Sequence, residues 1–148
     1  MPLHHTFSGK KRFDMEEIKK TLEEVRNIFA NDRFATENGA VIDSVGDHTA
    51  TCSLTVTPHH KNAMNALMGG VAFTLADFAF AVASNWQKPG TVSLNSSITF
   101  LGTPKGSRLS ATAVCVKNGR STCCYHIDVS DELGTPVAAV TTTGFHKA

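Results

Sequence analysis

The spacing of apolar residues changes along the chain, and the first spacing is helical. Apolar residues near the start recur every three or four positions, which is the period of an amphipathic α-helix. They are Met15, Ile18, Leu22, Val25 and Phe29. Asp14 is placed to cap this helix, and Glu17 three positions later completes a capping box. We expect a surface helix that packs on the rest of the fold, with binding to a partner as the alternative for its apolar face.

From about residue 40 apolar and polar residues alternate, as in half-buried β-strands. The first clear alternation covers residues 50–57, and Gly46-Asp47 just before it can turn a hairpin with a strand near residues 40–45. Four more alternating stretches follow the residues near 90. In three of them the apolar residues expected to share one face are Val92, Leu94, Ile98 and Phe100, then Leu109, Ala111, Ala113 and Cys115, then Cys123, Tyr125, Ile127 and Val129. The fourth stretch runs from Val137 to Phe145.

One stretch, Val71 to Trp86, does not alternate. Twelve of its 16 residues are apolar, and it is shorter than the roughly 20 residues that span a bilayer, so we expect a buried helix. Turn signals at Pro104 to Gly106, Asn118-Gly119 and Asp131 to Pro136 separate the later strands, and Asn118-Gly119 predicts a type I′ hairpin. The order predicts an α+β fold, with an antiparallel sheet of about six strands wrapped around a central apolar helix.

Composition narrows the class of protein. The length of 148 residues fits one domain, residues 1–148, with a polar leader and helix over 1–37 and the core over 38–148. A net charge of +1 provides no basic field for nucleic acid. With 41% hydrophobic and 18% charged residues, the chain is also too apolar to be disordered. No nucleic-acid partner and no membrane association are expected.

The cysteines and the N-terminal sequence suggest a location and argue against a metal site. The first twelve residues lack the apolar run of a signal peptide. The four cysteines form no CxxC pair, and no Cys/His spacing suits zinc. We therefore expect buried thiols in strands, a reducing compartment and a cytoplasmic protein without a bound metal.

Asp77 is the candidate for chemistry. It is the only charged residue between Asn62 and Gln87, and its neighbours in the predicted helix are apolar. A buried carboxylate without a partner is costly, and an apolar surround raises its basicity. A catalytic role explains it. The alternatives are a crevice where the helix reaches solvent and an ion pair with a structural arginine.

Met68-Gly69-Gly70 lies at the expected start of the same helix. Free N–H groups there can receive the oxyanion that forms when an acyl carbonyl is attacked, although the glycines can also simply shape the turn. Gly69 and Asp77 are eight residues apart, so they lie about 12 Å apart along a helix axis. One carbonyl cannot touch both. If they serve one site, Asp77 comes from a second subunit, which predicts a homodimer with two equivalent sites.

The segments His60-Lys61-Asn62 and Met68 to Asp77 resemble the signature of hotdog-fold acyl-CoA thioesterases of the phenylacetic-acid-degradation (PaaI-like) subfamily. The later segments Gly90 to Leu94 and Gly106 to Leu109 also match. The resemblance covers about residues 38–146. It implies a hotdog fold built of dimers, and many thioesterases of this kind pair further into a homotetramer, a dimer of dimers.

The resemblance implies a role for five residues. Asp77 matches the nucleophile or general base, and Gly69 with Gly70 matches the backbone donor that polarises the carbonyl. Asn62 matches the residue that positions the water or the thioester, and Ser93 a hydroxyl that assists near the carboxylate. In the family, the asparagine and glycines come from one subunit and the aspartate and serine from the other.

Other positions are candidates for substrate binding. Met68 stands where the family usually has histidine and can line an acyl pocket instead. Asn65 stands where the family usually has glycine, and asparagine tolerates a left-handed backbone. Lys105, Arg108 or Arg120 can meet the phosphates of coenzyme A, with ordinary strand-end charges as the alternative. The full set of expected substrate-binding residues is His60, Asn65, Met68, Arg108 and Arg120.

The expected activity is hydrolysis of an acyl-CoA thioester, with an aromatic or medium-chain acyl group. No metal or redox cofactor is expected for this hydrolysis. Coenzyme A enters as part of the substrate. The alternative is a hotdog protein that binds acyl-CoA without turnover, which the loss of the usual histidine at Met68 favours. A hydratase or dehydratase is disfavoured, since such sites pair a histidine with the acid, and a purely structural protein leaves Asp77 unexplained.

Overall fold

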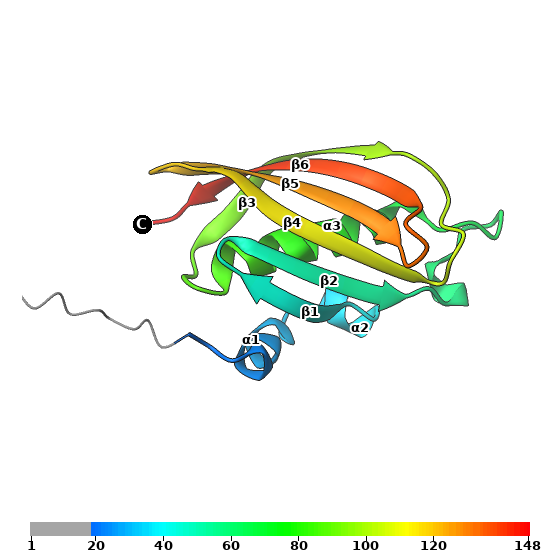
Figure 1. The fold of residues 1–148 in the computed structure, drawn as a ribbon, viewed down its shortest axis with the longest axis horizontal. Helices are drawn as coiled ribbons and strands as arrows, with labels where there is room; N and C mark the ends of the chain where they lie inside the picture. Colours follow the sequence, from blue (N-terminus) through cyan, green and yellow to red (C-terminus); the bar gives the residue numbers. More distant parts are fainter. Residues whose placement is uncertain (1–18) are drawn as a thin grey trace, which may run out of the picture.

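The computed structural model describes residues 19–148, and its main feature is an antiparallel sheet crossed on one face by a long helix (Figure 1). The strands are β1 (Val41–Gly46), β2 (Thr49–Thr55), β3 (Thr91–Phe100), β4 (Arg108–Asn118), β5 (Thr122–Asp131) and β6 (Pro136–His146). They lie in the order β1-β2-β4-β5-β6-β3. The helices are α1 (Leu22–Phe29), α2 (Arg33–Glu37), the short 3₁₀ helix η1 (Pro58–His60) and α3 (Gly69–Asn85). The predicted α+β fold is confirmed.

The core lies between α3 and the sheet, and α3 contacts all six strands. The predicted inward faces of β4 and β5 are confirmed at every position except Cys115, which is half-buried. Trp86 closes the far end of this core, where its indole N–H donates to the carbonyl of Gly46 at 2.8 Å. All four cysteines are free thiols, and Cys52 and Cys123 are buried.

The first helix begins later than predicted. Residues 19–21 are not helical, and the side chain of Thr21 caps α1 by accepting from the backbone N–H of Glu24 at 3.2 Å. A continuous helix from Asp14 to Phe29 is therefore wrong. Thr21 and Glu24 have the spacing of a capping box, which places the start close to the part of the helix that packs on the core. Asp14, Met15, Glu17 and Ile18 lie outside the described residues.

Strand β3 contains a bulge that the alternation does not reveal. Ser93 pairs with Gly144 and Asn95 pairs with Thr143, so Leu94 is an extra residue with no partner in β6. Such an insertion moves the residues on either side of it to opposite faces of the sheet.

The bulge corrects the predicted face of β3. Val92 pairs with Phe145 on the outer face, whereas Ile98 pairs with the buried Val140 on the face that carries α3. Val92, Leu94, Ile98 and Phe100 therefore do not share one face. The same bulge turns Ser93 toward the helix side.

The β4–β5 hairpin also differs from the prediction. Asn118 pairs with Cys123, and the N–H of Gly119 donates to the carbonyl of Thr122 at 2.8 Å, so the apex is Arg120–Ser121. Neither Asn118 nor Gly119 has the positive φ that a type I′ turn requires. Gly119 is needed for another reason, because a Cβ there would lie 2.8 Å from the carbonyl oxygen of Thr122.

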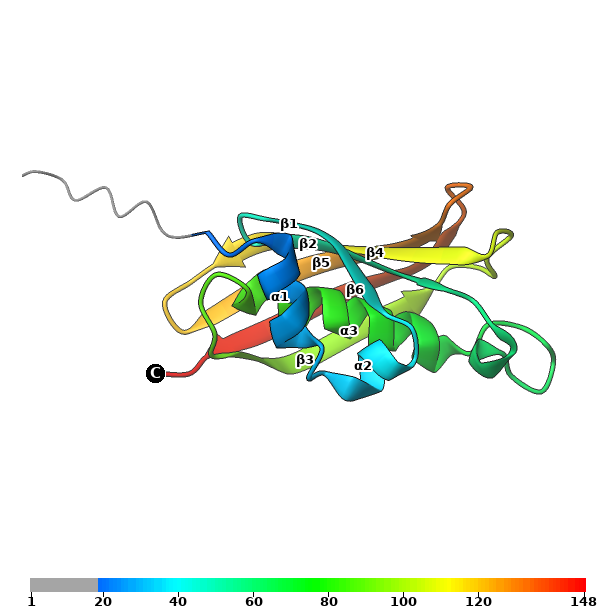
Figure 2. The same ribbon diagram turned by 90° about the horizontal axis from the view of Figure 1, so that it is seen from below.

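Two surfaces of the sheet lack a covering element. Strand β3 is an edge strand of ten residues with a free side, and Leu94 and Phe100 on it are 60% and 58% exposed. The three α-helices lie on one side of the sheet, so within the described chain its other face carries no helix (Figure 2). Among residues 19–148, no helix has the length and apolar character needed to cross a membrane.

Candidate functional site

Helix α3 is buried on most of its circumference but leaves one open stripe. The stripe consists of Gly70, Phe73, Thr74, Asp77 and Ala81, at the three- and four-residue spacing of one helix face. Asp77 is exposed there, while its neighbours Ala76 and Phe78 are buried. The carboxylate therefore faces a crevice and is not enclosed in the core, and none of the described residues forms an ion pair with it.

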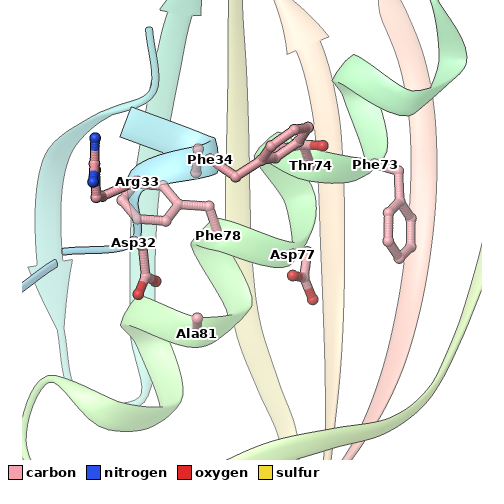
Figure 3. Close-up of a pocket in the computed structure, with 9 residues that line it drawn as sticks. Asp32, Arg33, Phe34, Phe73, Thr74, Asp77, Phe78 and Ala81 are labelled. Atoms are coloured by element: carbon pink, nitrogen blue, oxygen red, sulfur yellow. The ribbon is translucent and has the colours of Figure 1, made fainter. Parts of the chain in front are cut away.

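The crevice is a cavity of about 330 Å³ between α2 and α3, called here the carboxylate cavity. In Figure 3 the carboxylates of Asp77 and Asp32 lie on the same side of α3, and Arg33 points away from both. Arg33 is engaged elsewhere, because its Nε donates to Oε1 of Glu37 at 2.7 Å. The residues that line the cavity are Asp32, Arg33, Phe34, Ala35, Phe73, Thr74, Asp77, Phe78 and Ala81.

The surroundings make Asp77 more basic than an ordinary aspartate. Desolvation raises the pKa of Asp77, and the negative charge of Asp32 raises it further. Desolvation also raises the pKa of Asp32. Because no cation among residues 19–148 pairs with either group, this side of α3 holds a carboxylate suited to accept a proton.

The start of α3 offers backbone donors. No side chain caps this N-terminus, and the first N–H groups of a helix have no acceptor within it. A Cβ at Gly69 would lie 2.9 Å from the Phe100 ring, whereas a Cβ at Gly70 would meet only the end of Met68 at 3.5 Å. Gly69 is thus packed against an aromatic ring, and Gly70 borders open space.

The loop before α3 is held in place by His60. Its Nδ1 accepts from the backbone N–H of Thr57 at 2.9 Å, which leaves Nε2 to donate to the carbonyl of Asn38 at 2.7 Å. The carbonyl of His60 in turn accepts from the N–H of Met68 at 2.9 Å. With both ring nitrogens engaged and the side chain buried, His60 fixes the approach of the chain to the helix start.

Asn62 shapes the tip of the same loop. Its Oδ1 accepts from the N–H groups of Met64 and Ala66 at 2.9 and 3.1 Å. Its side-chain nitrogen donates to none of the described residues and is open to solvent or a ligand. Asn65 has φ of 61°, which confirms that asparagine supplies a left-handed backbone at this position.

A second cavity of about 220 Å³, called here the apolar cavity, lies beside the helix start. Apolar side chains supply most of its surface, and Met68 is among them. It shares Phe34, Ala35 and Thr74 with the carboxylate cavity. The residues that line it are Phe34, Ala35, Asn38, Ala40, Leu54, His59, His60, Met68, Gly70, Val71 and Thr74.

Comparison with known protein families shows which family the chain belongs to. The model of the thioesterase superfamily matches residues 64–138, about half of the chain, including the helix start and Asp77. The chain belongs to the thioesterase superfamily. The acyl-coenzyme A thioesterase PaaI of Escherichia coli is 32% identical to it over 120 residues, which cover 80% of this chain and 86% of that protein.

Solved structures agree with this assignment. The Escherichia coli PaaI structure, from the phenylacetic acid degradation operon, matches with a TM-score of 0.79 and 29% identity, covering 85% of this chain and 92% of that one. A hypothetical thioesterase protein from Streptococcus pneumoniae, solved with coenzyme A, matches with a TM-score of 0.74 and 25% identity, covering 81% and 97%. The hotdog fold and the resemblance to PaaI-like thioesterases are confirmed.

This thioesterase-superfamily chain does not bring all the predicted residues together. Gly69 and Gly70 begin α3, and Asp77 follows two turns later on the open stripe. Ser93 is on the helix-facing side of β3. Arg120, at the apex of the β4–β5 hairpin, is at the opposite end of the sheet from the start of α3 (Figure 1).

Arg108 lies at the same end of the sheet as the start of α3 but is already engaged. Its Nη2 donates to Oδ1 of Asp43 at 3.1 Å and to Oγ of Ser53 at 2.6 Å. Half of its side chain remains exposed. Among residues 19–148, no group of three histidine, cysteine or acidic side chains is arranged to hold a metal ion.

Helix α2 was not predicted; with its N-cap residue Asp32 and with Phe34 it lines the carboxylate cavity. Five residues are too few to show a helical period, so the pattern gave no signal for this helix. Asp32 occupies the N-cap position of α2 without making a capping hydrogen bond. Asparagine and aspartate at positions 31 and 32 were the available hint of a helix start.

Proposed function

We propose that the protein hydrolyses the thioester of an acyl-CoA at a site shared by two chains. One observation carries the proposal. The open stripe of α3 holds a carboxylate with a raised pKa and, two turns away, backbone donors without a capping side chain. Membership of the thioesterase superfamily and the acyl-CoA activity named for a 32% identical relative support the same chemistry.

The separation of the two groups supports a homodimer. Asp77 and Gly69 of one chain lie about 12 Å apart along the helix axis, too far for one carbonyl to contact both. A two-fold pairing brings Asp77 of one chain to the glycines of the partner subunit and makes two equal sites. The free edge of β3, with Leu94 and Phe100 exposed, is suited to this pairing. We further propose that the uncovered sheet face pairs two dimers into a homotetramer.

The proposed reaction follows from these positions. The thioester carbonyl accepts from the N–H groups of Gly69 and Gly70, and the amide nitrogen of Asn62 orients the water or the thioester. Asp77 of the other chain takes a proton as a water oxygen bonds to the carbonyl carbon, or attacks that carbon itself. Ser93 assists beside this carboxylate.

Collapse of the tetrahedral adduct breaks the carbon–sulfur bond. The sulfur leaves as the coenzyme A thiolate and takes up a proton. When water is the nucleophile, the carbonyl carbon becomes that of a carboxylic acid directly; when Asp77 attacks, an anhydride with Asp77 forms first, and water hydrolyses it to the acid and the free carboxylate. Both routes consume only water and the thioester, so we propose no metal or redox cofactor. Coenzyme A takes part as half of the substrate.

The apolar cavity supports an aromatic or medium-chain acyl group. A cavity of about 150 Å³ lined by apolar side chains is large enough for benzene. The apolar cavity of about 220 Å³ therefore has room for one aromatic ring with a short linker or for a chain of similar volume. Met68 and His60 line it, and Asn65 fixes the loop beside it.

Basic residues are proposed to meet the phosphates of coenzyme A. Arg108 lies at the sheet end that contains the start of α3, with half of its side chain exposed. Arg120 lies at the opposite end of the sheet from the start of α3 in its own chain. It can therefore meet coenzyme A only at a site where the partner subunit supplies the start of α3. The coenzyme A bound to the Streptococcus pneumoniae relative supports a site for this group.

The test is release of free thiol from a panel of acyl-CoA thioesters, with Asp77→Asn beside wild type. Loss of the carboxylate is expected to lower kcat by about 10²–10⁴-fold, the range for a general base. Asp47→Asn is the matched control, because Asp47 is an exposed aspartate in the β1–β2 turn away from both cavities. Equal rates of thiol release by wild type and Asp77→Asn on every substrate would show that Asp77 has no catalytic role.

The second candidate is an acyl-CoA-binding protein without turnover, which Met68 favours because the family usually has histidine there. Calorimetry on the same panel separates the two candidates. Tight binding of acyl-CoA by wild type with no thiol release would support the binding protein. Thiol release that depends on Asp77 supports the hydrolase.

A further inference from the structure

Phe34 is an aromatic side chain that the fold leaves 75% exposed beside the proposed site. It belongs to α2, which lies outside residues 64–138, the part matched by the superfamily. We infer that Phe34 contacts the acyl group of the substrate and determines how bulky that group can be. This inference rests on the proposed thioesterase function and assigns a specificity residue to it.

The position of Phe34 is what distinguishes it from other exposed apolar residues. Its ring lines the carboxylate cavity together with Asp77 and also lines the apolar cavity together with Gly70. In Figure 3 the ring overlaps Thr74 of α3 in projection, and Thr74 likewise lines both cavities. Phe34 therefore stands where the two cavities meet.

The reaction geometry sends the acyl group toward this ring. The carbonyl carbon lies between Gly70 of one chain and Asp77 of the other, and the acyl group begins at that carbon. The acyl group can extend into the apolar cavity beside Gly70 or into the carboxylate cavity beside Asp77. Since Phe34 lines both, the acyl group meets a Phe34 ring in either case, from one subunit or the other.

The other side of the helix start has a cavity of about 470 Å³, which Gly69 and Phe100 line and Phe34 does not. On the other side of α3 the Phe100 ring is packed against Gly69, so close that a Cβ there would lie 2.9 Å from it. Gly70 has only the flexible end of Met68 near it. Because an aromatic ring packs against Gly69 and only a flexible side-chain end lies near Gly70, we place the acyl group on the side of Gly70, where Phe34 lies, and not in the cavity beside Gly69.

The chemistry of the ring suits selection by size and shape. An aromatic acyl group can pack edge-to-face or offset against a phenylalanine ring. A single methylene that fits or does not fit an apolar pocket changes discrimination by about 10–200-fold. Removal of the ring joins the two cavities, and a larger ring narrows their junction.

The test compares kcat/KM for hexanoyl-, phenylacetyl- and decanoyl-CoA in wild type, Phe34→Ala and Phe34→Trp. For Phe34→Ala the ratio of decanoyl-CoA to hexanoyl-CoA is expected to rise by about 10-fold or more, and for Phe34→Trp to fall. Ile28→Ala is the matched control, since Ile28 is also an exposed apolar residue of the N-terminal helices but lines neither cavity. Its ratios are expected to equal those of wild type.

Each contrary outcome is distinguishable. Ratios that stay the same in both Phe34 variants, while wild type hydrolyses the panel, would overturn this inference and leave the thioesterase function intact. A Phe34→Ala protein with unchanged ratios but half the native mass by light scattering would assign the ring to subunit contact instead. Absence of thiol release by wild type on all three substrates would overturn both the proposed function and the inference.

Discussion

The carboxylate cavity pairs two aspartates of unlike origin. Asp77 comes from the open stripe of α3 and Asp32 from the N-cap of α2, and no described cation pairs with either. Arg33, the one basic residue that lines the cavity, is paired with Glu37. Asp32 is therefore expected to act through Asp77, by keeping its pKa high.

This coupling predicts the effect of Asp32→Asn on the pH dependence of hydrolysis. The charge of Asp32 raises the pKa of Asp77, so its removal lowers that pKa. A general base works in its ionised form, above its pKa, and the acidic limb of the kcat/KM profile should therefore move to lower pH. Asp47→Asn, in the exposed β1–β2 turn away from the cavity, should leave the limb in place. A limb that stays fixed or moves to higher pH in Asp32→Asn would contradict the coupling.

Individual residues of the site differ in how far the sequence predicts them. Asp77 stands out as a lone charge in an apolar stretch, and the glycines mark the helix start, so both are found by inspection. His60 does not reveal its structural role, because its hydrogen bonds to Thr57 and Asn38 exist only in the folded chain. Asp32 gives only the hint of a helix start and Phe34 gives no signal, because both reach the carboxylate cavity through the packing of α2 on a distant helix.

At the scale of elements, strong periodicity is predictive and local irregularity is not. Regular alternation identifies β4, β5 and β6, because in these strands the apolar residues are the ones that face the core. The bulge at Leu94 is invisible in the sequence, because register is set by pairing with β6. The same holds for the apex at Arg120–Ser121, where the contact of Gly119 with Thr122 overrides the usual turn preference.

The packing of β6 on α3 predicts a sensitive position at Gly144. A Cβ there would lie 2.7 Å from Sγ of Cys123 and 2.9 Å from Cζ of Phe80. Gly144→Ala should lower the free energy of unfolding by about 1–3 kcal/mol, the usual cost of overpacking a core. Gly102→Ala, where a Cβ would meet its nearest atom at 3.4 Å, should change it little. Denaturant unfolding measures both, and a Gly144→Ala protein as stable as wild type would contradict the packing.

At the scale of the whole molecule, the proposed reaction needs two chains. Asp77 and the glycines share one helix, so their separation cannot be closed by movement within the chain. The free edge of β3 and the uncovered sheet face are the surfaces available to further copies (Figures 1 and 2). The spacing of residues in the sequence predicts this requirement, whereas the surfaces emerge only from the fold.

The most direct test of a shared site is complementation between two inactive variants. Asp77→Asn lacks the base, and Asn62→Asp keeps the loop acceptor but loses the amide donor; each alone should release little thiol. When equal amounts are unfolded and refolded together, half of the dimers are mixed, and each mixed dimer has one intact site. Thiol release should recover to about a quarter of the wild-type rate. A mixture no more active than its parents would show that the site lies within a single chain and would contradict the account.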